Sequence, residues 1–462
     1  MKSKATSARS WKKNSKKIAL DEQWEKINPD AAGIDIGSRD HYVCVPAGRD
    51  REAVRRFGTT TPELNEMAGW LRQCGVRTVA MEATGVYWIA SFQILERAGF
   101  QVILVNPRQI KNVNGRKSDV QDCQWIQKLH TFGLLAGSFR PADPYVCARS
   151  CLREREEMVA GRGGQIQRMQ KALHQMNVQL SHVLSDISGE SGLAIIEAIL
   201  AGERNPVTMA KLANKRVQSS REQIARALVG DYRAEHLFSL RNAYDLYKMY
   251  EAKIRACDEE LSKQLDSLPD QVDLQAKPLP PAAPKKQIDE KLRAGLYLKL
   301  GVDITAIEGV GPVVGLTMLT EVGPSLKAFP TEKHFCSWLG VCPDNRISGG
   351  KVLSVRTRKV SNRLSDALRM AASALKNSQS ALGAHHRRMK ARLGAAEAIT
   401  ATAHKLARLI YRLIKHGQEY VRQGIEEYEK KHQQRRMTTL RKMAQSLGAK
   451  ILEPEALAAA VS

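Results

Sequence analysis

A carboxylate inside an apolar run near the start of the chain places the strongest constraint on its fold. The stretch AGIDIGS, residues 32–38, and the apolar run 41–45 flank a turn, and this pattern predicts a β-hairpin. Asp35 interrupts the first run. A carboxylate in a buried strand is costly unless it is paired, and a divalent cation is its usual partner. Asp35 also fits a turn in which it accepts hydrogen bonds from the amides of Gly37 and Ser38, so this stretch alone leaves both interpretations open.

From residue 31 to about residue 143, apolar runs alternate with helical patterns, which predicts an α/β domain. The runs cover residues 32–36, 41–46, 77–81 and 101–105, and helical periodicity covers residues 62–73 and 87–98. In the first helical stretch Leu64, Met67, Ala68 and Leu71 share one face. Glu82 follows the third run, at the carboxyl end of a predicted strand, where ligand sites of open α/β sheets concentrate.

Two further acids lie in a helix that follows the last of these strands. Ser118 is expected to cap this helix. Asp119 and Asp122 are three residues apart, so on a helix they point from one face and can reach a common cation. The alternative is that both acids only complement the helix dipole.

The order of these four acids resembles that of ribonuclease-H/RuvC-like nucleases: an Asp within a strand, a Glu at a strand end, and an Asp pair on a helix. Such sites hold two Mg²⁺ ions about 4 Å apart. Carboxylate oxygens are the ligands that Mg²⁺ prefers, and Mn²⁺ is its natural substitute. The combination therefore predicts a metal site on Asp35, Glu82, Asp119 and Asp122.

Between residues 145 and 268 the apolar period changes to seven residues, which is typical of coiled coils. The repeating positions are Leu152, Val159, Ile166, Leu173 and Leu180 in one segment, and Leu240, Tyr247, Ile254, Leu261 and Leu268 in the other. The two segments can pair with each other or with another subunit, and both possibilities remain open. Residues 185–233 between them show mixed helix and loop and no recognisable chemistry.

A proline-rich linker, residues 270–285, leads to a second, mostly helical region with two candidate phosphate contacts. The Gly309-Val310-Gly311 turn resembles a helix-hairpin-helix, whose turn amides grip a backbone phosphate, although an ordinary packing turn fits equally well. Ser348 precedes Gly349 and Gly350 in a loop rich in cations, where glycines permit close approach of a phosphate. The residues leave open whether Ser348 is a nucleophile or only donates a hydrogen bond.

The amino-acid composition indicates which classes of partner the chain can bind. Lys and Arg outnumber Asp and Glu by 72 to 48, a net charge of +24 that suits nucleic acid. No run has the length of a transmembrane helix, and the first residues lack a signal-peptide core, so we expect a cytoplasmic protein with no membrane partner. The eight cysteines form no CxxC pair, which argues against a zinc knuckle. Aromatic residues, at 5%, are too sparse for a platform that stacks single strands.

Five motifs together resemble the DEDD transposases of the IS110 insertion-sequence family, its IS1111 branch included. They are GIDIG (33–37), MEATG (81–85), KSDVQD (117–122), IEGVGP (307–312) and SGGK (348–351). The resemblance implies a RuvC-like domain, a coiled coil and a helical transposase domain. It implies Mg²⁺ on the four acids and Ser348 as the nucleophile that forms a phosphoserine link to DNA. It also implies donor and target DNA as substrates, a structured bridge RNA as guide, and dimers that pair into tetramers with sites shared between subunits.

The predicted organisation is therefore α/β followed by all-α. We expect a basic arm (1–30), a RuvC-like domain (31–144), a coiled-coil region (145–269), the linker (270–285), a transposase domain (286–423) and a charged tail (424–462). The predicted nucleic-acid contacts are the glycines and cations of the loops: Lys111, Arg116, Lys117, Gly309, Gly311, Arg346, Gly349, Gly350, Lys351, Arg356, Arg358, Lys359 and Arg363.

Two other functions fit parts of this pattern. A RuvC-like junction nuclease would use the same Mg²⁺ site and hydrolyse DNA with water, with Ser348 as a phosphate contact only. An architectural DNA or RNA binder would use the acids structurally, but carboxylates facing an anionic duplex would weaken its binding. A recombinase that cuts and rejoins DNA accounts for both the acids and the serine.

Overall fold

The chain divides into two units, Met1–Arg140 and Pro141–Ser462. The first unit contains a five-stranded sheet. The structure is a computed structural model and describes residues 25–110, 118–281 and 289–449. The strands are β1 (Ala31–Ile36), β2 (Asp40–Cys44), β3 (Val54–Gly58), β4 (Thr78–Glu82) and β5 (Gln101–Val105). They lie in the order β3-β2-β1-β4-β5. β1, β2 and β3 are antiparallel, and β4 and β5 run parallel to β1.

Helices cover both faces of this sheet. They are α1 (Thr61–Gln73), α2 (Trp88–Arg97), α3 (Pro107–Ile110) and α4 (Asp119–Thr131). On one face, Ile34 and Met81 of the sheet share a core with Leu64 and Leu71 of α1 and Leu95 of α2. On the other face, Ala80 packs with Ile126 of α4. The α/β prediction for this region is confirmed, including the hairpin of β1 and β2.

Strand β3 was not predicted, because two arginines in its middle break the apolar pattern. The strand lies at the edge of the sheet, where charged side chains reach solvent and partners. Arg55 pairs with Asp50 at 3.0 Å, and Arg56 pairs with Asp40 at 2.8 Å. Ion pairing at an exposed edge thus permits a strand that its apolar content alone does not indicate.

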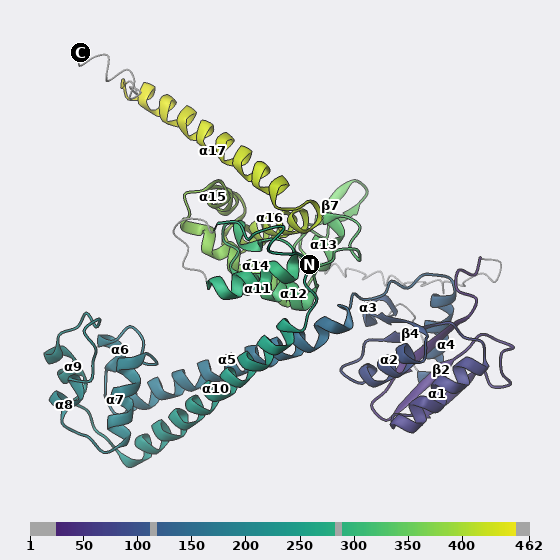
Figure 1. Ribbon diagram of the computed structural model, residues 1–462, viewed down its shortest axis with the longest axis horizontal. Helices are drawn as coiled ribbons and strands as arrows, with labels where there is room; N and C mark the ends of the chain where they lie inside the picture. The colour runs from purple at the N-terminus through teal and green to yellow at the C-terminus, as the bar shows by residue number, and fades with distance from the viewer. Residues whose placement is uncertain (1–24, 111–117, 282–288, 450–462) are drawn as a thin grey trace, which may run out of the picture. The chain divides into compact units, whose positions relative to one another are not determined.

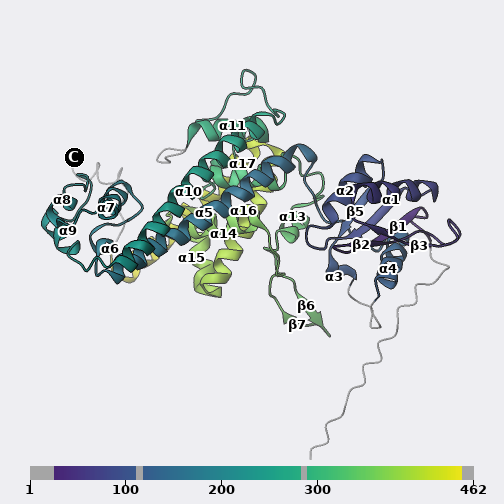
Figure 2. The same ribbon diagram turned by 90° about the horizontal axis from the view of Figure 1, so that it is seen from below.

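Two long helices, α5 (Asp143–Gln175) and α10 (Ala234–Asp266), pack along each other in the second unit (Figures 1 and 2). Arg155 pairs with Asp258, and Arg162 pairs with Glu251. Since the partner number falls as the residue number rises, the two helices are antiparallel. The heptad segments therefore pair with each other within one chain. Short helices connect them: α6 (Leu180–Val183), α7 (Glu190–Leu200), α8 (Pro206–Ala210) and α9 (Arg221–Ala227).

The rest of the second unit is a helical bundle with one small hairpin. Its elements are α11 (Glu290–Leu300), η1 (Ile304–Ala306), α12 (Pro312–Glu321), α13 (Glu332–Trp338), β6 (Arg346–Ser348), β7 (Lys351–Ser354), α14 (Arg363–Ala374), η2 (Leu375–Asn377), α15 (Ala381–Leu393), α16 (Ala395–His416) and α17 (Gln418–Ser446). The region expected to be a charged tail begins inside α17, and most of its described part is helix. Of the helices in the described ranges, none combines the length and apolar character that crossing a membrane requires.

Candidate active site

Asp35 and Glu82 occupy matching positions on two neighbouring parallel strands. β1 pairs with β4 as far as Ile34 opposite Met81, so the next position places Asp35 beside Glu82. Neighbouring strands lie about 4.8 Å apart, and successive side chains alternate between the two faces. Both carboxylates therefore point to the same side of the sheet. Both are half-buried, and Glu82 accepts a hydrogen bond from the Thr84 hydroxyl at 3.2 Å.

Helix α4 covers this side of the sheet. Gly33 lies two residues before Asp35 and therefore on the same face. A Cβ atom on Gly33 would lie 2.2 Å from the backbone nitrogen of Gln127 and 2.5 Å from the carbonyl oxygen of Cys123. Only glycine permits such a close approach of two backbones, so α4 packs directly on β1.

The direction of α4 brings its two acids toward Asp35. The side-chain amide of Gln127 donates to the carbonyl of Ala31, at the start of β1, at 3.3 Å. The earlier part of the helix therefore lies farther along β1. Asp119 and Asp122 are in its first turn, after the Ser118 cap, and this turn lies toward the end of β1 that holds Asp35.

The surroundings of the Cys123 thiol agree with the position of Asp35 near α4. The pKa of Cys123 is raised by a hydrogen bond with Cys44, then by burial, and further by the charges of Cys44 and Asp35. Cys123 directly follows Asp122 in the helix. Asp35 and the first turns of α4 thus approach the same region of the first unit.

The donor set of this acidic face suits a hard divalent cation, because it offers carboxylate oxygens from two strands and one helix. Within the described ranges, no three or more His, Cys, Asp or Glu side chains are grouped as a metal site. The backbone therefore places the four predicted acids on one side of the sheet, but their side chains do not converge on a single metal position.

Substituting Gly33 should disturb this arrangement more than any exposed substitution nearby. The added methyl group of Gly33→Ala would overlap the α4 backbone, and overpacking of this kind typically costs about 1–3 kcal/mol. We expect a lower midpoint of thermal unfolding and weaker binding of Mg²⁺, measured by calorimetry, because α4 must move away from β1.

Gly69→Ala is the matched control for this prediction. Gly69 lies in α1, and a Cβ atom there has no neighbouring atom within 4 Å. Alanine at a helical glycine typically stabilises by about 0.5–1 kcal/mol. An unchanged unfolding midpoint for Gly33→Ala would show that α4 does not pack on β1 as described.

Ser348 lies in the second unit, at the end of a two-stranded hairpin that the sequence predicted only as a loop. β6 and β7 are antiparallel, and Ser348 pairs with Lys351 across the turn. Gly349 and Gly350 have φ angles of 55° and 75°, as a two-residue hairpin turn with two left-handed positions requires. Ser348 and its two glycines are exposed. The paired glycines therefore fix a tight turn that presents the serine hydroxyl to solvent.

The predicted nucleic-acid contacts differ in their surroundings. Lys111, Arg116 and Lys117 lie outside the described residues, as does the basic arm up to residue 24, and the side chain of Arg346 is not described either. Lys351, Arg356 and Lys359 are exposed beside the hairpin. Arg358 is exposed as well, but it donates to the carbonyl of Ser337 at 2.6 Å. These loops thus present cations near Ser348, some of which also support the fold.

The two glycines of the helix-hairpin-helix-like turn have different roles. Gly309 has a φ of +80°, and a Cβ atom there would lie 2.9 Å from Leu375. Gly311 is the N-cap of α12, and a Cβ atom there would have no neighbouring atom within 4 Å. Packing and backbone conformation account for Gly309, and phosphate binding at this turn stays a prediction.

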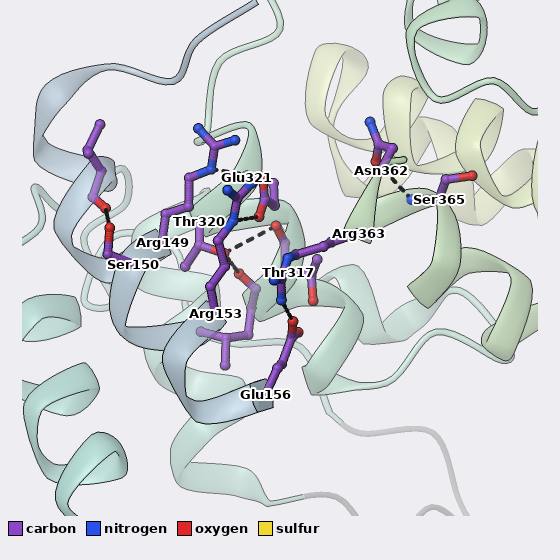
Figure 3. Close-up of polar contacts among 12 residues, drawn as sticks. Arg149, Ser150, Arg153, Glu156, Thr317, Thr320, Glu321, Asn362, Arg363 and Ser365 are labelled. Carbon is purple, nitrogen blue, oxygen red and sulfur yellow. Dashed lines mark hydrogen bonds and ion pairs between the residues drawn. The ribbon is translucent and has the colours of Figure 1, made fainter. Parts of the chain in front are cut away.

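Three arginine–carboxylate pairs fasten α5 to the bundle that carries the hairpin (Figure 3). Glu321, at the end of α12, is 7% exposed. Its carboxylate accepts two hydrogen bonds from the Arg153 guanidinium, at 2.8 and 2.9 Å, and pairs with the Arg149 guanidinium at 2.9 Å. Arg363, where α14 begins after the hairpin, pairs with Glu156. Arg363 was predicted to contact nucleic acid; the structure gives it this partner within the chain.

Neutralising Glu321 should destabilise the second unit. Glu321→Gln leaves two arginines without their carboxylate, and hydrogen bonds to charged groups are typically worth about 1.5–3 kcal/mol. We expect the second unit of the variant to unfold at a lower urea concentration than that of the natural chain. Urea titration of the full chain, monitored by circular dichroism at 222 nm, measures this. Glu427→Gln, which removes an exposed pair with Lys431 on α17, should leave the curve unchanged. Equal curves for Glu321→Gln and the natural chain would contradict this role.

Arg149, Arg153 and Glu321 were not predicted from the sequence. Arg149 and Arg153 are four residues apart and so share one face of α5, which is the one local signal that could have indicated a carboxylate partner. Nothing local identifies Glu321 as that partner, since it lies 168 residues after Arg153.

Comparison with protein families gives two matches. A family model described as Transposase, of the DEDD type of IS110 elements, matches residues 32–178, which include all four acids. A second, described as Transposase IS116/IS110/IS902 family, matches residues 303–387, which include Ser348. Together they cover about half of the chain. No curated protein matches it. One model covers the α/β unit with its four acids and continues into α5, and the other covers the helical region with the exposed serine; the chain therefore belongs to the IS110 family of DNA transposases.

Proposed function

We propose that this transposase cuts and rejoins DNA through a covalent phosphoserine on Ser348, with Mg²⁺ held by Asp35, Glu82, Asp119 and Asp122. The observation that carries the proposal is the shared register of Asp35 and Glu82, on the sheet face covered by the helix that bears the other two acids. Two half-buried carboxylates side by side repel each other. A bound cation would relieve that repulsion.

The metal supplies charge: when bound, Mg²⁺ stabilises negative charge that develops on the phosphate oxygens. The chain's own residues would hold and orient it. The two strand acids lie on the rigid sheet and would fix its position. Asp119 and Asp122, in the more exposed first turn of α4, would complete the ligand set as the side chains close.

Ser348 would exchange one ester bond for another. Its Oγ forms a bond to phosphorus, the bond from phosphorus to one deoxyribose oxygen breaks, and the proton of the hydroxyl passes to the released oxygen. One phosphodiester is lost and one phosphoserine diester is gained, so the reverse step can rejoin strands without a high-energy cofactor. Cations near the hairpin, such as Lys351 and Arg356, would stabilise the charge at phosphorus.

We further propose a structured bridge RNA as guide and a dimer that pairs into a tetramer. The net charge of +24 supports a polyanionic guide in addition to DNA. Acids and serine lie in different units of the chain, and such a division is compatible with sites built from two subunits.

Recombination of donor and target plasmids by the purified full chain tests the proposal. We expect product only with Mg²⁺ or Mn²⁺ and with RNA transcribed from the flanks of the element, and protein covalently attached to DNA after denaturation. Cleaved DNA without attached protein would instead identify a nuclease that hydrolyses with water. Recombination in the absence of RNA would contradict the proposed guide RNA and leave the proposed phosphoserine chemistry standing.

A further inference from the structure

Helix α17 divides into two halves of different character. Residues 418–429 are anchored on the bundle: Val421 is buried, Lys405 lies 3.6 Å from the ring centre of Tyr428, and Glu429 accepts the amide of Ala381 at 2.8 Å. Residues 430–446 are exposed, except for the half-buried His432 and Ala444. The helix thus continues for 17 residues beyond its anchor.

Charge divides at the same point. All four acids of α17, Glu419, Glu426, Glu427 and Glu429, lie in the anchored half. The exposed half has six cations and no acid: Lys430, Lys431, Arg435, Arg436, Arg441 and Lys442. Lys431 reaches back to pair with Glu427. The exposed half is therefore a strongly basic rod that continues an acidic half, in which Arg422 is the only cation among residues 418–429.

The cations are also sorted around the helix. At about 100° per residue, Lys430, Lys431, Arg435, Arg441 and Lys442 fall within an arc of about 140°. The opposite side carries the exposed apolar residues Leu440 and Met443 together with Arg436, while exposed Met437 lies at the border of the basic arc, about 20° from Lys430. One continuous side of the exposed half thus presents five cations over about 20 Å of helix.

We infer that this basic side, Lys430, Lys431, Arg435, Arg441 and Lys442, binds the phosphodiester backbone of a duplex outside the active site. The inference rests on the proposed action on nucleic acid. A duplex carries one negative charge about every 1.7 Å of its axis, so a rod with five cations on one side faces a phosphate row of the complementary sign. Such contacts hold and orient a duplex without reading its sequence.

The salt dependence of binding by the full chain tests this inference. A variant with all five basic-side residues changed to Gln keeps the helix, because Gln has nearly the helix propensity of Lys and Arg. Fluorescence anisotropy with a DNA duplex and with an RNA hairpin, between about 50 and 200 mM salt, gives the slope of log K against log salt. Each lost phosphate contact lowers the steepness by about 0.9, so we expect a reduction of about 4 to 5. A reduction confined to one probe identifies DNA or RNA as the ligand.

The matched control removes the same charge elsewhere. Lys211, Lys215, Arg216, Arg221 and Arg226 are exposed around α8 and α9, and changing all five to Gln should alter the slope by less than about 1. Equal slopes for the α17 variant and the natural chain would overturn the inference. Equal reductions in both variants would overturn it too, because they would show an effect of net charge alone. A change of mass in solution for Met437→Gln/Leu440→Gln, with an unchanged slope for the five-Gln variant, would assign the helix to protein contacts instead.

Two readouts keep this inference separate from the proposed chemistry. At low salt the five-Gln variant should still attach covalently to DNA, whereas Ser348→Ala should keep the full salt slope and form no attachment.

Discussion

Ser348→Ala is expected to form no covalent adduct with DNA and to slow recombination at least about a thousandfold, because the other serine of the hairpin, Ser354, lies away from the turn and cannot take over the phosphorus bond. The substitution leaves the Gly349–Gly350 turn in place, and Ser348 is exposed, so its hydroxyl supports no core packing. Labelled DNA that migrates with protein on denaturing gels measures the adduct, and plasmid recombination measures the rate.

Ser354→Ala is the control within the same hairpin. Ser354 lies on β7, opposite Arg346 and away from the turn, so its hydroxyl is remote from the site that Ser348 occupies along the strands. We expect this variant to form adduct at the natural level. Adduct formation by Ser348→Ala would show that another residue is the nucleophile and would contradict the proposed role of Ser348.

Asp35→Asn and Glu82→Gln should each lower DNA cleavage by about a thousandfold or more at any Mg²⁺ concentration, because each exchanges a charged metal ligand for a neutral amide of the same size. Thermal unfolding without metal should stay unchanged or shift upward, since the substitution removes repulsion between neighbouring carboxylates. Cleavage rates across a Mg²⁺ titration and calorimetric binding of Mg²⁺ provide the measurements.

Glu66→Gln serves as the control for the acids. Glu66 is an exposed carboxylate on α1, which packs on the sheet face opposite α4. Its loss should leave both cleavage and metal binding at natural levels. Full activity in Asp35→Asn and Glu82→Gln would show that the acids are structural, and would favour a protein that binds nucleic acid without cutting it.

Sequence alone predicted the elements that depend on local pattern. Four of five strands, the helices around Leu64 and Phe92, and the two heptad helices, though not their pairing, follow from the period of apolar residues, which burial enforces directly. The position of Glu82 at a strand end follows from the same pattern. These features need no knowledge of which segments meet.

Features set by distant contacts could not be predicted in this way. The register that places Asp35 beside Glu82 depends on pairing between strands 47 residues apart. The direction of α4 depends on the contact of Gly33 with Cys123 and Gln127. The hairpin at Ser348 resembles a loop in sequence because its strands are only three and four residues long and largely exposed. Local periodicity has no signal for any of these.

The antiparallel pairing of α5 with α10 has a consequence for folding during synthesis. The first unit ends at Arg140, before α5 begins. The last residue of α10 follows the end of α5 by 91 positions. At typical translation rates, synthesis of α10 is therefore complete roughly 5 to 18 s after that of α5. Glu321 and Arg363 arrive later still. Until then the heptad face of α5 lacks its α10 partner, so chaperones or a neighbouring nascent copy have a defined interval in which to bind it.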